Sequence, residues 1–358
     1  MNKRGGQKTI YLHGSFHSEN YGDYLLCEIP AKELKNAFGD IELVTDQISD
    51  LYLRYADIER LKLPTCVHRC SLAVAVGGGY YGEKQRGDHR WYYRCFINHI
   101  VPFLLLKLFG KRYAIIGVGA GPISNKLLAA CVRRVFNLAD YVSVRDEESR
   151  LFLTQIGVKT NIEVNPDWVL SDSTLKLLDA QDNKDQPPKL LIHISKIWDS
   201  SALVEVCEAV NTFLAENKAI KCILITDNTN QKAALDYLQN KIKGDKIIRP
   251  YSNPLETLRT ISECDYLITS KLHVGITGYR LKKKVLVIPL HQKIMRFYHQ
   301  VNWDQYVVGS RDICRESFLE KMNHCFLLDN PVYNKDVYKA ANNNVDRLLS
   351  YVVGRMEK

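Results

Sequence analysis

Residues 266–293 read YLITSKLHVGITGYRLKKKVLVIPLHQK. A short apolar strand is expected at Tyr266–Thr269, a helix carrying small residues follows, and a second strand is expected at Val285–Pro289. Lys271 and His273 stand where the first strand gives way to the helix. Free backbone N–H groups and the helix dipole favour an anion at such a junction. A plain helix start with a chance lysine and histidine is the alternative.

Similar strand–helix alternation runs through the rest of the chain and indicates an α/β fold with two Rossmann-like parallel-sheet domains facing a cleft. The polar stretch 181–188 contains prolines and is expected to be the linker. The expected organisation is therefore an N-terminal domain at 1–180 that binds the acceptor, a C-terminal domain at 189–330 that binds the donor, and a final helix at 331–358 that packs back on the first domain.

The composition is that of a globular protein of 358 residues with a formal net charge of +9. Basic residues are dispersed apart from Lys282–Lys284, and aromatic residues do not alternate with them, which argues against nucleic acid. The ten cysteines form no C-x-x-C pair, and Cys66 and Cys70 have no second ligand pair at zinc-site spacing, so no metal site is predicted. No export signal is recognised, and no apolar run is long enough to cross a membrane.

The apolar, aromatic stretch Trp91–Phe109 is predicted to be one helix, bent at Pro102. A core helix is the favoured interpretation, because a parallel sheet must be covered on both faces. A peripheral contact with a membrane is the alternative.

Two glycine-rich loops follow predicted strands, at Gly77–Gly82 and Gly117–Gly121. The first fits G-x-G-x-x-G, but no Asp or Glu lies between Asp88 and Asp140, where a dinucleotide fold would need one for the ribose. No G-x-x-x-x-G-K-[ST] motif is present. The glycines are expected to let the backbone approach a ligand or to make tight turns.

Together with these loops, several short motifs occur in an order that resembles the polysaccharide pyruvyl transferase family. The pieces are Asn20-x-Gly22-Asp23, Gly77–Gly79, Gly117–Pro122, Ser143–Asp146 with Ser149, Pro166-Asp167, Ser270-x-Leu272-His273 and Lys293. The resemblance implies a fold like that of the GT-B glycosyltransferases. It also implies transfer of the enolpyruvyl group of phosphoenolpyruvate onto two hydroxyls of a sugar. The family usually has arginine where this chain has Lys271, which loses the planar fork that grips an anion in two places.

Phosphoenolpyruvate carries a phosphate and a carboxylate, so its site needs fixed positive charge. Arg145, Lys271, His273 and Lys293 are the predicted donor-binding residues. His273 is also the candidate acid and Asp23 the candidate base. Core burial of His273, an ion pair of Arg145 with a neighbouring acid, and N-capping by Asp23 are the respective alternatives.

The predicted acceptor and cleft residues are Asn20, Asp23, Gly78, Gly79 and Asp167. Asp167 alternatively only ends the first domain. The expected partners are phosphoenolpyruvate and a sugar or lipid-linked glycan, with no cofactor and a cytoplasmic location. A nucleotide-sugar glycosyltransferase that uses the Glu256/Glu263 region, or a non-catalytic glycan-binding relative, would fit the same architecture.

Overall fold

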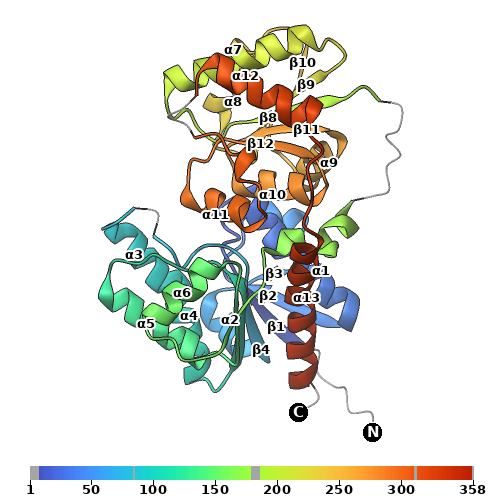
Figure 1. Cartoon of the computed structure of the whole chain (residues 1–358). Coiled ribbons are helices and arrows are strands. Elements are labelled where there is room, and N and C mark those ends of the chain that lie inside the picture. The colour runs from blue at the N-terminus through green and yellow to red at the C-terminus, as the bar shows by residue number, and fades with distance from the viewer. Residues whose placement is uncertain (1–7, 84, 179–185, 310–312, 357–358) are drawn as a thin grey trace. The chain divides into compact units, whose positions relative to one another are not determined.

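The computed structural model describes residues 8–83, 85–178, 186–309 and 313–356, which form two compact units (Figure 1). Unit 1 comprises the chain up to Glu19, Asp23–Ser173 and the chain from Asp336 on. Unit 2 comprises Asn20–Gly22 and Thr174–Lys335. The expected linker 181–188 lies mostly outside the described residues. Assignment of the short segment Asn20–Gly22 to unit 2 differs from the sequence-based boundary.

Unit 1 is built on a seven-stranded sheet in the order β3-β2-β1-β4-β5-β6-β7, and every pair in it is parallel. Its strands are nearly continuous apolar runs, as in β4, where all five residues are buried. That pattern is expected of a sheet covered on both faces. The strands are β1 (Lys8–His13), β2 (Ile41–Thr45), β3 (Glu59–Arg60), β4 (Leu72–Val76), β5 (Arg112–Val118), β6 (Tyr141–Val144) and β7 (Ile162–Val164).

Helices lie on both faces of this sheet, with α1 and α13 on one side and α2, α4, α5 and α6 on the other (Figure 1). The second group shares one apolar cluster with β1, β4, β5 and β6. The helices of unit 1 are α1 (Tyr21–Phe38), α2 (Leu63–Arg69), α3 (His89–Cys95), η2 (Phe96–Ile100), α4 (Val101–Leu108), α5 (Lys126–Leu138), α6 (Glu147–Gln155) and α13 (Lys335–Met356), with short turns η1 (Tyr52–Arg54) and η3 (Trp168–Leu170). The turn η4 (Asp172–Leu177) begins in unit 1 and ends in unit 2.

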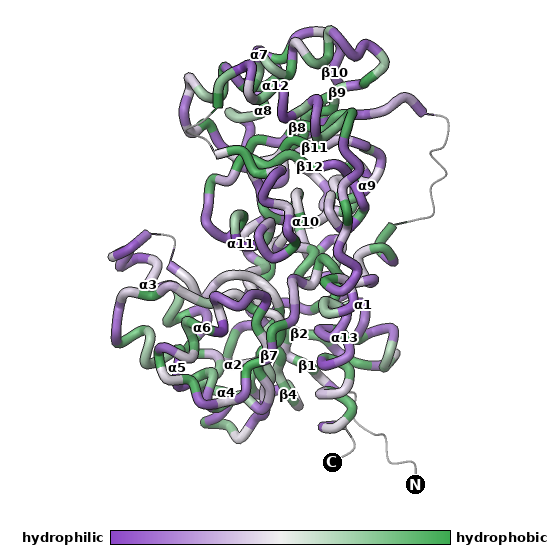
Figure 2. The backbone as a smooth tube through the Cα atoms, in the orientation of Figure 1, coloured by the Kyte–Doolittle hydropathy of each residue, from purple (hydrophilic) through white to green (hydrophobic). Residues whose placement is uncertain are grey.

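Unit 2 has the same type of architecture, built on a five-stranded parallel sheet in the order β10-β9-β8-β11-β12. Helices α7 and α12 lie on one side of it, and α9, α10 and α11 on the other (Figure 1). The strands of each sheet are mainly hydrophobic and the connecting loops mainly hydrophilic (Figure 2). Its elements are β8 (Lys189–His193), α7 (Ser200–Glu216), β9 (Lys221–Ile225), α8 (Lys232–Lys241), β10 (Lys246–Arg249), α9 (Pro254–Glu263), β11 (Tyr266–Thr269), α10 (Leu272–Arg280), β12 (Lys284–Val287), α11 (Gln292–Gln300), η5 (Asp304–Tyr306), α12 (Arg315–Met322) and η6 (Asn323–Leu328).

The predicted fold class of two parallel sheets with flanking helices is thus confirmed. The predicted helix Trp91–Phe109 is present as a continuous run of helical residues, in which α3 passes through the π-helical turn η2 into α4. Pro102 lies directly after η2, in the first turn of α4. A π-helical turn is one way in which a helix accommodates the N–H group that a proline lacks. A bend at Pro102 stays a prediction.

Candidate functional site

Polar side chains gather at the carboxyl edge of the sheet in unit 2, where the strand order reverses between β8 and β11. Ligands of open α/β sheets bind in the crevice outside such a switch point. Thr269 ends β11, and Ser270 and Lys271 follow it. The Ser270 hydroxyl accepts a hydrogen bond from the Ser195 backbone N–H at 2.8 Å, which ties the loops after the two strands together.

A buried network lies under Lys271. Its ammonium lies 3.3 Å from Oδ2 of Asp227, and Oδ1 of the same carboxylate lies 3.1 Å from Nε2 of His193. Burial by itself raises the pKa of the Asp227 carboxyl, but the charges of His193 and Lys271 and hydrogen bonds from His193 and Gln231 outweigh it and hold that pKa well below its usual range. Lys271 therefore belongs to a fixed charge pair, while a quarter of its side chain remains exposed to solvent.

Helix α10 begins directly after this network, and its N-cap residue, Lys271, provides no capping side chain. By contrast, Asn253 caps α9 and Asp199 caps α7 with side-chain oxygens. The first N–H groups of a helix without such a cap, together with the helix dipole, suit an anionic ligand. His273 lies in this first turn with 6% of its surface exposed, which keeps both the ligand and the core-histidine interpretations open.

The segment Asn20–Gly22 contacts unit 2 next to α10. The Tyr21 backbone N–H donates to the carbonyl of Asp227 at 2.8 Å, and the Tyr21 hydroxyl lies 3.1 Å from that of Thr277. A Cβ atom built on Gly22 would lie only 1.8 Å from Nδ1 of His273, so the imidazole packs directly on the Gly22 backbone. Two motifs that are 250 residues apart in the chain therefore meet in one unit.

In unit 1, the two glycine-rich loops lie against the guanidinium group of Arg145. A Cβ on Gly79 would lie 3.2 Å from its Nη2, and one on Gly119 would lie 2.9 Å from its Nε. The loops also bond each other, since the Gly119 N–H donates to the carbonyl of Gly78 at 2.7 Å. Glycine at these positions leaves room for the arginine, which is 9% exposed.

Ser143 and Ser149, the serines of the motif around Arg145, hold the second loop in place. Their hydroxyls accept hydrogen bonds, both at 2.9 Å, from the backbone N–H groups of Gly117 and Ala120 respectively. The same motif supplies Asp146, which caps α6 by accepting from the Ser149 N–H at 2.8 Å. The spacing of this motif therefore places its two serines against the glycine-rich loop and its aspartate at the start of α6.

Arg145 makes the ion pair that its alternative interpretation predicted. Its Nε lies 3.4 Å from Oδ2 of Asp146, and its Nη1 lies 3.6 Å from Oδ2 of Asp167. Asp167 also caps the short turn η3 through the N–H of Val169. A guanidinium has five N–H donors, so these pairs do not exhaust its capacity to bind an anion. Binding of a donor by Arg145 stays a prediction.

The remaining predicted residues are divided between the units. Asn20 accepts a hydrogen bond from the Gly22 N–H at 3.0 Å and so caps α1, the role considered for Asp23. Asp23 lies in the first turn of α1 and accepts a hydrogen bond from the Ser18 hydroxyl. Lys293 is exposed in the first turn of α11, after β12. Unit 1 holds Asp23, Gly78, Gly79, Arg145 and Asp167, and unit 2 holds Asn20, Lys271, His273 and Lys293.

A sequence profile of the polysaccharide pyruvyl transferase family matches residues 20–292, which contain all the residues just placed except Lys293. The chain belongs to this family. A comparison with curated proteins gave no match.

Several solved structures of UDP-binding proteins and UDP-sugar epimerases are similar to this pyruvyl transferase family member. They include a UDP-N-acetylglucosamine 2-epimerase of Listeria monocytogenes (TM-score 0.64, 11% identity, 98% of this chain and 96% of that one). Another is the UDP-GlcNAc 2-epimerase of Methanocaldococcus jannaschii (TM-score 0.63, 14% identity, 96% and 99%). A third is MnaA of S. aureus in complex with UDP (TM-score 0.60, 11% identity, 98% and 97%). At these identities the similarity establishes a fold of the GT-B type and nothing further.

Sequence reasoning missed His193 and Asp227, although each stands at or just after the end of a predicted strand in this family member. A further polar network lies at the end of β1. Nδ1 of His13 lies 3.0 Å from the Tyr11 hydroxyl, and Nε2 of His13 lies 3.0 Å from Nδ1 of His99 in η2. Burial and the nearby His13 lower the pKa of His99 well below its usual value. A polar residue at the end of an apolar strand is the signal that would have found both His193 and Asp227.

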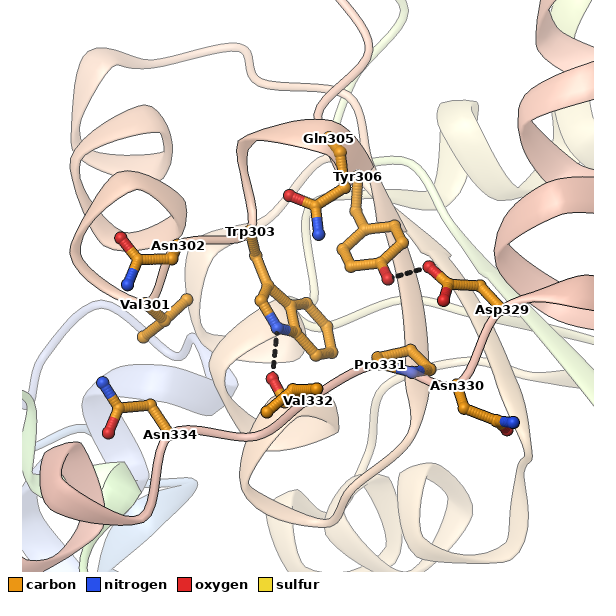
Figure 3. Close-up of a pocket in the computed structure, with 10 residues that line it drawn as sticks. All are labelled: Val301, Asn302, Trp303, Gln305, Tyr306, Asp329, Asn330, Pro331, Val332 and Asn334. Atoms are coloured by element: carbon orange, nitrogen blue, oxygen red, sulfur yellow. Dashed lines mark hydrogen bonds between the residues drawn. The ribbon is translucent and has the colours of Figure 1, made fainter.

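Two cavities in unit 2 of this transferase-family chain lie apart from the residues predicted to bind the donor and the acceptor. One, of about 420 Å³, surrounds Trp303, whose Nε1 donates to the carbonyl of Val332 at 2.9 Å (Figure 3). The other, of about 460 Å³, is lined in part by Glu256 and Glu263. Glu263 is already paired with Arg249 at 3.2 Å.

Within the described ranges, no three His, Cys, Asp or Glu side chains lie where they would jointly hold a metal ion. Among the residues that the structure describes, no helix is both long and apolar enough to span a bilayer.

Proposed function

We propose that this protein transfers the enolpyruvyl group of phosphoenolpyruvate to two hydroxyls of a sugar in a polysaccharide or glycan precursor, with release of phosphate. Family membership supports a transferase of this general class. The observation that carries the proposal is the start of α10, where Lys271 and His273 flank a helix N-terminus that has no capping side chain. Such a position suits the phosphate of the donor.

The reaction has needs that named residues would meet. A proton adds to the methylene carbon of phosphoenolpyruvate, and the two sugar oxygens bond to the central carbon as its bond to the phosphate oxygen breaks. The two hydroxyls lose two protons, of which one balances the proton gained by carbon and the other leaves on phosphate. His273 would act as phosphate ligand and acid, and Asp23 as base. Lys271 would stabilise the departing phosphate through its fixed charge.

Arg145 and Lys293 would bind the other anionic oxygens of the donor, Arg145 in the bidentate manner that suits a carboxylate. Asn20, Gly78, Gly79 and Asp167 would line the acceptor side. No cofactor is proposed, because the energy of the phosphate ester drives the transfer. A cytoplasmic location and a lipid-linked or soluble glycan acceptor complete the proposal.

The test is incubation with phosphoenolpyruvate and a panel of glycans, measuring phosphate release together with the mass gain of a pyruvate ketal. Both signals are expected with at least one acceptor, and His273→Ala is expected to abolish them while the protein stays folded. His324→Ala, which changes an exposed histidine of the same unit, is the matched control and keeps full activity. Full activity of His273→Ala would remove His273 from the mechanism.

The competing functions predict different ligands. A nucleotide-sugar glycosyltransferase is stabilised against heat by a nucleoside diphosphate sugar and not by phosphoenolpyruvate. A non-catalytic glycan-binding protein binds glycan without releasing phosphate. Thermal-shift measurements with each ligand, repeated on Lys271→Met, distinguish the three, because only the proposed function requires Lys271 for the response to phosphoenolpyruvate.

A further inference from the structure

One stretch of unit 1 contains basic residues and no acidic residue that would balance them within the stretch. Residues 89–139 contain no Asp or Glu, whereas the formal net charge of the whole chain is +9. This stretch folds into α3, η2, α4, β5 and α5. Its lysines and arginines are Arg90, Arg94, Lys107, Lys111, Arg112, Lys126, Arg133 and Arg134. The stretch therefore has a formal net charge of +8, which favours anionic partners.

Large apolar side chains on the same elements are exposed to solvent. Their exposed fractions are 69% for Tyr93, 38% for Phe96, 39% for Ile97, 77% for Leu108 and 58% for Phe109. The opposite side of the same helices packs on the sheet and contributes Cys95, Ile100, Phe103 and Leu106 to the buried cluster. The core therefore does not account for the exposed residues, and such a patch on a soluble surface indicates an interaction site.

Helix α5 extends this surface. The Tyr92 hydroxyl lies 2.7 Å from that of Ser124, just before α5, and Leu127 in the first turn of α5 is 77% exposed. Figure 1 shows α3 and α5 as neighbours in unit 1. We refer to the exposed residues of α3, η2, α4 and the start of α5 as the basic apolar face.

Two carboxylates lie near the α3 end of this face, and both are engaged in other contacts: Asp88 caps α3, and Glu83 accepts hydrogen bonds from Tyr92 and Ser124. Among the described residues, Arg90 and Arg94 are exposed and make no ion pair. At the α4 end, Lys107 and Arg112 each lie 3.9 Å from Asp140, which is their acidic neighbour. Arginines beside exposed aromatic and aliphatic groups are the composition of helices that lie in a membrane interface.

Other occupants fit less well. Two copies of the chain would bring like charges together, which is unfavourable at close range. A single-stranded nucleic acid would use the aromatic rings and arginines, but it would leave Ile97, Leu108 and Leu127 without a partner. Anionic lipids satisfy both properties, because their phosphates pair with arginine and their acyl region takes up the apolar side chains.

We propose that the basic apolar face binds membranes that contain anionic phospholipids, with Arg90 and Arg94 on the lipid phosphates and Tyr93, Ile97 and Leu108 in the boundary between headgroups and acyl chains. This surface would bring the protein to a lipid-linked acceptor, but the binding itself does not rest on the proposed transfer reaction. Loss of one therefore does not imply loss of the other.

The test is co-sedimentation of the full chain with vesicles of phosphatidylcholine, alone or with phosphatidylglycerol. Binding is expected only with phosphatidylglycerol present. Each lysine or arginine near an anionic surface is worth roughly a fivefold change in affinity, so Arg90→Gln with Arg94→Gln should weaken binding about 30-fold. Tyr93→Ser with Leu108→Ser should also weaken it at least about tenfold.

Matched controls on unit 2 are Lys218→Gln with Lys243→Gln and Leu328→Ser with Val332→Ser, which change equally exposed residues and should bind as the unchanged protein does. Melting temperatures show that all variants fold. Absence of binding, equal binding to neutral vesicles, or unchanged binding by Tyr93→Ser with Leu108→Ser overturns the proposal. Displacement of the vesicles by single-stranded DNA at low concentration overturns it too and assigns the face to nucleic acid.

Discussion

The contact between Gly22 and His273 makes a sharp prediction, because one added methyl group should displace the proposed acid. The backbone of Gly22 is helical with a negative φ, so alanine fits the local conformation. The new Cβ would nevertheless start 1.8 Å from Nδ1 of His273, whereas ordinary contact begins at 3.4 Å. One of the two groups must therefore move by about 1.6 Å.

A displacement of this size has two expected consequences. Misplacing a reacting group by about 1 Å costs roughly 100-fold in rate, so kcat for phosphate release should fall at least about 100-fold in Gly22→Ala. Forcing an extra methyl into a packed contact destabilises by about 1–3 kcal/mol, less the gain of about 0.5–1 kcal/mol for alanine over glycine in a helix. A net loss of about 1 kcal/mol in unfolding free energy is therefore expected.

The assays are phosphate release with phosphoenolpyruvate and an accepting glycan, and urea unfolding. Gly354→Ala is the matched control, because Gly354 is also helical and a Cβ there meets no atom within 4 Å. It should keep full activity and gain up to about 1 kcal/mol. A second check compares Gly22→Ala in the unchanged protein and in His273→Gly. The alanine should be better tolerated when the imidazole is absent.

Gly22→Ala with kcat within threefold of the unchanged protein would refute this reasoning, since it would mean that His273 moves freely or takes no part. An equal destabilisation with and without the imidazole would likewise show that the contact does not matter.

Three further predictions concern the charges. Lys271→Met should raise the KM for phosphoenolpyruvate at least about tenfold, because it removes the positive charge. Lys271→Arg keeps the charge and should raise the KM less. Equal KM values for the two variants would exclude a charge contact with the donor. Asp227→Asn should lower the unfolding free energy at pH 7 by about 3 kcal/mol. The pKa of Asp227 in the folded protein lies below the unfolded value of about 4. The carboxylate therefore contributes to the free energy of unfolding above that pH, and the contribution fades as the pH falls below it. Between about pH 5 and pH 2, the unfolding free energy measured in urea should thus decline less steeply in the variant than in the unchanged protein. Gly119→Ala, whose Cβ would meet Nε of Arg145 at 2.9 Å, should weaken binding of phosphoenolpyruvate in calorimetry about tenfold while kcat changes little; unchanged affinity would place Arg145 outside the donor site.

Much of the candidate site was within reach of sequence reasoning because its residues follow apolar strands. Lys271 after β11 and Arg145 after β6 were found in this way. His193 also lies at the end of an apolar strand, β8. A single histidine in an apolar run is nevertheless interpreted as a core residue as long as its hydrogen-bond partner is unknown. That partner, Asp227, comes from another strand, and only the parallel order of the sheet brings the two together.

The sequence by itself determined the two-sheet fold class, because continuous apolar runs of strand length and helix caps such as Asn253 are local properties of the chain. It also placed charge at the junction 266–293, since the order strand, lysine, helix is written in adjacent residues. Only the tertiary structure decided that Asn20–Gly22 joins unit 2 and that Gly22 supports His273. Likewise, only the tertiary structure showed that Lys271 is paired with Asp227. Such contacts join residues that are far apart in the chain. They depend on how the elements pack closely against one another, and a local sequence pattern contains no information about that packing.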